Sequence, residues 1–294
     1  MSEGGEGSFP TPQKEFLKTL VGKKLVKVAL GGNQDNGLDF KSVRVVGRHL
    51  REIDDEIPEK GLPFAVKDHF QKLGYNIEPQ FQADEDKKIL EKNPVLVVAT
   101  HPYLMDPVNL IGSLPESRKD TSVVGNTAFQ SLGDNFSDHV IPIYRSGNNY
   151  HVEGRALLWR KYGLPQEEHT FYEAGKLNKQ SIDMAAQRIN EGGIVIFLPD
   201  GSTEGKEWYP GVGELVKQIG RDDARVVFAV AEKPRMRDYV RASSKVARYL
   251  PPATSHVFYS QPHLIEEFAS SGDKRQAITQ NLKQTYESFV QVAV

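Results

Sequence analysis

Three short runs of consecutive apolar residues constrain the fold of this chain more than any other feature of its sequence. They cover Val95–Ala99, Ile194–Phe197 and residues 226–230. Strands of a parallel sheet have this composition, because helices cover both faces of the sheet and bury every side chain. Before the second run, Ser181 can cap a helix that Gly192 ends. This alternation predicts an α/β fold with one central, mostly parallel or mixed sheet flanked by helices.

The rest of the sequence divides the 294 residues into three parts. Residues 1–12 are rich in Gly, Glu and Ser and are expected to form a flexible tail. Residues 13–74 are expected to be an N-terminal helical segment, with one helix within 14–30 and another within 57–73. Residues 75–294 are expected to form the α/β domain. Further strands are predicted at 75–82, 123–124 and 140–143.

The charged side chains are almost balanced, with 37 Lys and Arg against 39 Asp and Glu. This balance gives no overall basic character that would indicate nucleic-acid binding. The chain has no cysteine, which excludes disulfides, thiolate zinc sites and a cysteine nucleophile. We find no secretory signal and no apolar run of the about 18 residues that a transmembrane helix needs. We therefore expect a cytoplasmic protein.

His101 and Asp106 follow the first apolar run, in the segment Thr-His-Pro-Tyr-Leu-Met-Asp-Pro. Open α/β sheets build their sites at the carboxyl ends of strands. Asp106 before a proline also suits the N-cap of a helix, and a lone histidine is more often structural. A turn between the two can instead fold the carboxylate onto the imidazole, where it fixes the tautomer and stabilises the imidazolium. The pair is a candidate general base with its orienting carboxylate.

A second polar segment, Pro-Asp-Gly-Ser-Thr-Glu-Gly-Lys, closely follows the Ile194–Phe197 run. Gly201 allows backbone N–H groups to approach an anion closely, and Ser202 and Thr203 add hydroxyl groups. An ordinary turn is the simpler interpretation of this segment on its own. Neither a P-loop nor a nucleophile elbow is present in its sequence.

Arg145 closely follows the strand that is predicted at 140–143. A guanidinium group is always charged and can bind a phosphate with two donors at once. Taken singly, an arginine at the end of a strand is more often a surface charge. In combination with the other two segments, it is a candidate for acceptor recognition.

In this order and spacing, the three segments resemble the glycerophosphate and lysophospholipid acyltransferase superfamily. Residues 101–106 match its His-x-x-x-x-Asp motif, and 143–145 match its second block, which ends in arginine. Residues 197–202 match its Phe-Pro-Glu-Gly-Thr block, and 226–234 loosely match a fourth, apolar block with proline. The resemblance covers about residues 75–235 and implies a glycerol-3-phosphate acyltransferase-like fold.

The resemblance implies transfer of a fatty acyl group from acyl-CoA or acyl carrier protein to a hydroxyl of a glycerophosphate or lysophospholipid. His101 would act as general base, Asp106 would orient it, and N–H groups near Gly201 would stabilise the oxyanion. No covalent acyl-enzyme, cofactor or metal is implied. The residues that would bind substrate are Arg145, Asp200, Gly201, Ser202, Thr203 and Lys206.

Two residues depart from the pattern of the superfamily. Asp200 stands in place of the usual glutamate. Thr203 stands where many members carry an arginine that helps to bind the acceptor phosphate, and Lys206 can supply that charge. These departures concern the acceptor and leave the acyl-transfer chemistry unaffected.

Two segments with closely spaced basic residues suggest reversible contact with a membrane surface. Lys233, Arg237, Arg241 and Lys245 recur every four positions opposite an apolar stripe, and lysines also recur within 14–28. A solvated helix face, or packing against the catalytic domain, is the ordinary explanation. The functional alternatives are that these basic segments bind acyl carrier protein, the phosphates of CoA or anionic lipid.

Three competing functions use the same residues differently. The same chemistry could act on another acceptor, such as a sugar or a different alcohol. A thioesterase or esterase would use water as the acceptor, with His101 still the base. A non-catalytic lipid-binding protein would not need the pair of His101 and Asp106 at all.

Overall fold

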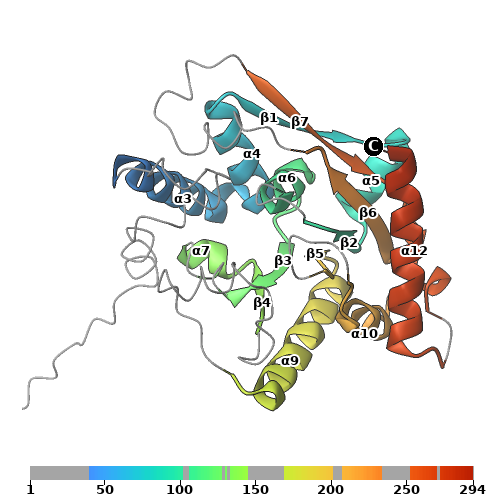
Figure 1. The fold of residues 1–294 in the computed structure, drawn as a ribbon. Coiled ribbons are helices and arrows are strands. Elements are labelled where there is room, and N and C mark those ends of the chain that lie inside the picture. Colours follow the sequence, from blue (N-terminus) through green and yellow to red (C-terminus); the bar gives the residue numbers. More distant parts are fainter. Residues whose placement is uncertain are drawn as a thin grey trace, which may run out of the picture.

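The computed structural model describes residues 40–101, 106–127, 130, 133–144, 169–200, 207–233, 252–269 and 272–293. In this part of the chain, strands form one sheet in the order β1-β7-β6-β2-β5-β3-β4, with β8 paired to β6 (Figure 1). Neighbouring strands are parallel, except that β6 is antiparallel to β7 and β8. The predicted α/β fold with a mixed, mostly parallel sheet is therefore confirmed. The strands are β1 (Tyr75–Gln80), β2 (Val95–Ala99), β3 (Thr121–Asn126), β4 (Val140–Ile143), β5 (Ile194–Phe197), β6 (Arg225–Ala231), β7 (Ala253–Tyr259) and β8 (His263–Leu264).

Helices cover both faces of the sheet (Figure 1). Every residue of β2 is buried, and its side chains alternate between two separate cores. Val95 and Val97 join the core beneath α3, α4 and α6, whereas Leu96 and Val98 join the core beneath α9, α10 and α12. The two-sided cover explains the unbroken apolar run in the sequence. The helices are α3 (Phe40–Lys60), α4 (Leu62–Lys72), α5 (Asp84–Lys92), α6 (Asp106–Ser113), α7 (Asp134–Ser137), α9 (Phe171–Asn190), α10 (Gly211–Gln218) and α12 (Arg275–Ala293). A short 3-10 helix, Ile265–Glu267, lies between β8 and α12.

The helix predicted within 57–73 is confirmed by α4, although the first residues of this range belong to the end of α3. The helical conformation is interrupted between α3 and α4 at Gly61, whose φ of 85° lies in the left-handed region. A proline then occupies the first turn of α4, where its missing N–H is tolerated. The two helices pack against each other as a hairpin.

The prediction that Ser181 caps a helix was wrong. Helix α9 begins ten residues earlier, at Phe171, and Thr170 and Glu173 form a reciprocal capping box at its start. Ser181 lies buried inside α9, where its hydroxyl donates to the carbonyl oxygen of Pro142 at 2.5 Å. The serine therefore ties α9 to β4 instead of starting the helix.

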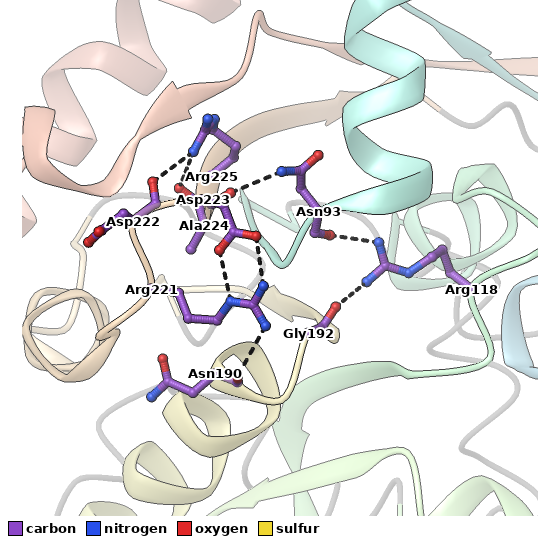
Figure 2. A network of polar contacts seen from close by, with 9 residues as sticks. All are labelled: Asn93, Arg118, Asn190, Gly192, Arg221, Asp222, Asp223, Ala224 and Arg225. Carbon is purple, nitrogen blue, oxygen red and sulfur yellow. Dashed lines mark hydrogen bonds and ion pairs between the residues drawn. The ribbon is translucent and has the colours of Figure 1, made fainter.

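A network of polar contacts that includes three arginines lies at the amino-terminal edge of the sheet (Figure 2). The buried Arg118 guanidinium donates to the carbonyl oxygens of Leu90, Asn93 and Gly192 at 2.7–2.8 Å and pairs with Asp120. Leu90 lies in the last turn of α5, where carbonyl oxygens lack an N–H donor within the helix and suit a cation. Arg118 thus joins the chain segments that lead into three of the strands.

Among the described helices, none combines the length and the hydropathy that crossing a bilayer requires. The predicted flexible tail, the predicted helix within 14–30 and the basic segment beyond Lys233 lie outside the described residues. The division of the chain at residues 12 and 74 stays a prediction.

Candidate active site

His101 and Asp200 leave neighbouring parallel strands at the same edge of the sheet. Strands β2 and β5 pair with Val98 opposite Phe197, and each of the two site residues comes three positions after that pair. Because parallel strands end at one edge, their following residues are brought together there. His101 is partly exposed, whereas Asp200 is only 2% exposed.

Asp106 begins helix α6, which follows β2 in the chain. Its side chain is 2% exposed, so the carboxylate is withdrawn from solvent at the amino-terminal end of the helix. A negative charge is favoured there by the helix dipole. Helix α6 packs against α4 and the strands beneath it, which fixes the position of the carboxylate relative to the sheet.

Tyr286 of α12 joins this edge of the sheet and was missed by the sequence analysis. Its hydroxyl lies 2.7 Å from Oγ1 of Thr100, the residue before His101, and accepts from the Thr100 backbone N–H at 3.4 Å. Burial raises the pKa of Tyr286; its hydrogen bonds to Thr100 oppose the shift, while the charges of Asp200 and Asp106 add to it. Both carboxylates therefore lie close enough to act on one hydroxyl group.

A signal for α12 is present in the sequence. Ile278, Leu282 and Tyr286 recur every four residues and are all buried, as expected for one face of a helix. Local spacing predicts the helix, but it does not tell which loop the tyrosine hydroxyl contacts.

The end of β4 is held in place by α9. Asn178 accepts a hydrogen bond from the Tyr144 N–H at 2.7 Å and donates one to the Tyr144 carbonyl oxygen at 2.8 Å. An amide side chain that binds both groups of one residue fixes the direction in which the backbone leaves the strand. Arg145 is the next residue of the chain, although it lies outside the described residues.

The predicted site residues are thus only partly described. The structure brings His101, Asp106 and Asp200 to the carboxyl edge of the sheet, in a partly shielded environment. Their predicted roles stay predictions. Outside the described residues lie Arg145, Gly201, Ser202, Thr203 and Lys206.

In the described part of the chain, one group of side chains has the spacing of metal ligands. It consists of His49, Glu52 and His69, which lie on α3 and α4. His101 is not a member of this group. At the carboxyl edge, a histidine can accept a proton, and nearby carboxylates can stabilise the resulting positive charge, which is the chemistry of general-base catalysis.

Comparison with known proteins gives one structural similarity that we report here. No protein-family model matches the chain, and no curated protein matches its sequence. The structure is similar to that of the 1-acyl-sn-glycerophosphate (LPA) acyltransferase, PlsC, from Thermotoga maritima, with a TM-score of 0.43 and 13% sequence identity. The similarity covers 95% of this chain and 94% of that chain. At these values, neither the family nor the activity of that enzyme follows for this chain.

Proposed function

We propose that the protein is an acyltransferase that moves a fatty acyl group from acyl-CoA or acyl carrier protein to a hydroxyl of a glycerophosphate or lysophospholipid. The observation that supports this most is the meeting of His101, Asp106 and Asp200 at one edge of the sheet. These residues belong to the motifs whose order resembles the acyltransferase superfamily. A catalytic base needs this partly shielded position, where it reaches substrate and a buried carboxylate.

In the proposed reaction, His101 takes the proton of the acceptor hydroxyl as its oxygen attacks the thioester carbonyl carbon. Asp106 stabilises the imidazolium that forms. N–H groups near Gly201 stabilise the negative charge on the carbonyl oxygen. The carbon–sulfur bond then breaks, and the thiol leaves with the proton from His101. The products are an ester and a free thiol, so the step needs no further reactant.

The acceptor phosphate is assigned to Arg145 and Lys206, with Ser202 as a hydrogen-bonding partner. The proposal for Arg145 is supported by the two hydrogen bonds that fix Tyr144 immediately before it. The guanidinium group would then reach the phosphate from a rigid strand end, which favours precise binding.

A second candidate is the same chemistry on an acceptor without a phosphate. Asp200 and Thr203 depart from the residues of the superfamily that concern the acceptor. Asp200 is buried at the proposed acceptor site, and its side chain is one carbon shorter than the glutamate that it replaces. Comparison of phosphorylated and neutral acceptors separates the two candidates.

The first experiment measures thiol release from palmitoyl-CoA with and without glycerol 3-phosphate or lysophosphatidic acid. We expect release that depends on the acceptor and that falls by about 10²–10⁴-fold in His101→Ala and Asp106→Asn, because general-base catalysis contributes about that much. His256→Ala is the control, since this histidine lies on β7 and pairs with Glu232 and Glu78 at the surface.

Three results would contradict parts of the proposal. Release that persists in His101→Ala would exclude this residue as the base. Release that does not change when every alcohol acceptor is removed would identify a thioesterase. Transfer to neutral alcohols alone would exclude the phosphorylated acceptor and leave the acyl transfer itself intact.

A further inference from the structure

Two histidines and a glutamate converge between the first two described helices. His49 and Glu52 lie one turn apart on α3, and His69 lies on α4. The reversal of the chain at Gly61 brings the two helices together. Oε2 of Glu52 is 3.8 Å from Nδ1 of His49 and 3.7 Å from Nδ1 of His69.

These separations are longer than a hydrogen bond but lie within the distance of an ion pair. The imidazole rings are also close, with centroids 4.7 Å apart and planes inclined by 64°. One ligand atom from each of the three side chains lies within 4.8 Å of the other two.

The three donor atoms form a set that divalent transition metals prefer. Zinc binds imidazole nitrogen and carboxylate oxygen at about 2.0–2.2 Å. In a tetrahedral site with such bonds, neighbouring ligand atoms lie about 3.3 Å apart. The two distances from Glu52 exceed this value by about half an ångström, which small side-chain rotations can close around an ion.

Burial prepares the two histidines for this role. The side chains of His49 and His69 are 11% and 5% exposed, whereas that of Glu52 is 49% exposed. Burial, with the neighbouring His49 ring, lowers the pKa of His69 to about 4. Its Nε2 atom is buried and has no hydrogen-bond partner among the described residues. An ion can enter from solvent on the side of Glu52.

Lys72 is the cation whose charge would oppose a bound metal, because it also acts on His69. Its ammonium group is paired with Glu56 at 3.0 Å and with Asp68 at 2.6 Å. Two carboxylates therefore balance the lysine charge, and Glu52 adds a further negative charge near the two histidines. The local charge is compatible with a divalent cation.

We propose that His49, Glu52 and His69 form a binding site for a divalent transition metal ion of the zinc class, which fastens α3 to α4. The three side chains leave a fourth coordination position for water. Helix α4 packs against α6, the helix that begins at Asp106. The ion thus stabilises the support of the candidate active site without taking part in its chemistry. The site does not depend on the proposed acyl transfer.

The test is titration of Zn²⁺ into the full chain, prepared metal-free, with calorimetry and thermal unfolding as readouts. We expect one equivalent of Zn²⁺ to bind and the unfolding midpoint to rise by about 5 °C or more at a hundredfold excess over Kd. Glu52→Gln should weaken binding by at least about 100-fold, because loss of an outer partner of a ligand already costs about 10–100-fold. This residue is half-exposed, so the variant should fold.

Matched variants give the control. Glu56→Gln changes a carboxylate of the same helix that is paired with Lys72 and does not belong to the three ligands. Lys72 keeps its pair with Asp68 in Glu56→Gln, so we expect the Zn²⁺ affinity of this variant, and that of His101→Ala, to stay within about threefold of the unmodified chain. The proposal is overturned if no stoichiometric binding occurs, if Glu52→Gln and Glu56→Gln weaken binding equally, or if His101→Ala abolishes it.

Discussion

Arg118 offers a quantitative test of the structure that does not depend on the proposed activity. We consider Arg118→Met, which keeps much of the side-chain length and removes all donors. In the native structure, the guanidinium group donates to three backbone carbonyl oxygens, at 2.8, 2.7 and 2.7 Å, besides pairing with Asp120. Figure 2 shows two of these bonds, to Asn93 and Gly192. The arginine side chain is 6% exposed, so water reaches little of this network.

The expected loss follows from the groups that the substitution leaves without a donor. A buried polar group without a partner costs about 1–3 kcal/mol, so three carbonyl oxygens cost about 3 kcal/mol even at the lower bound. Asp120 adds little, because its side chain is 49% exposed and can be hydrated. We expect the free energy of unfolding to fall by about 3–5 kcal/mol, which agrees with removal of one partner of a buried ion pair.

Urea denaturation followed by circular dichroism measures this loss. With a slope of about 3 kcal/mol per molar urea, the midpoint should fall by about 1 M or more. Arg118→Lys should give an intermediate shift, because one ammonium group cannot reach all three carbonyl oxygens in the geometry of a guanidinium fork.

The control is Arg221→Met, within the same region of Figure 2. Arg221 also pairs with an aspartate, Asp223, at 2.7 Å, but its side chain is 39% exposed. Surface pairs of this kind contribute little to stability, so its midpoint should match that of the unmodified chain. Equal midpoints for Arg118→Met and Arg221→Met would refute the role of burial in this reasoning.

Three further predictions use the same assays. Gly213→Ala should lower the free energy of unfolding by about 1–3 kcal/mol, because the new Cβ atom would lie 2.1 Å from a carbonyl oxygen of α12. Its control is Gly220→Ala, whose Cβ atom would have nothing within 4 Å and which should change this free energy by less than about 0.5 kcal/mol. Asn178→Ala releases Tyr144 and should raise KM for a phosphorylated acceptor more than it lowers kcat; a change in kcat alone would contradict this. Tyr286→Phe should cost about 1–2 kcal/mol of stability in urea denaturation, and an unchanged midpoint would contradict its hydrogen bonds.

The central strands could be predicted from the sequence because burial on both faces determines their composition. The predicted ranges 95–99, 140–143 and 194–197 coincide with β2, β4 and β5. The position of His101 and Asp200 at the end of their strands follows from the same pattern. Strands that are connected through a helix usually pair in parallel. Parallel pairing of β2 and β5 then places both residues at one edge of the sheet.

Other features could not be predicted because they depend on contacts between distant parts of the chain. The start of α9 is an exception, because its signal, the capping box of Thr170 and Glu173, is local; it was missed because the first half of α9 presents few apolar residues to the core. The contact between Thr100 and Tyr286 joins residues 186 positions apart. The cluster of His49, Glu52 and His69 depends on the angle between two helices, which spacing does not give.

The insertion of β7 between β1 and β6 has a consequence for biosynthesis. Tyr75 of β1 pairs with Ala253 of β7, which the ribosome adds 178 residues later. At a synthesis rate of about 5–20 residues per second, β1 waits about 10–35 s for this partner. During that interval the hairpin of α3 and α4 has formed from local contacts, while its neighbouring strand still presents unpaired backbone groups. The nascent chain therefore needs protection from aggregation at its beginning until nearly all of it has been translated.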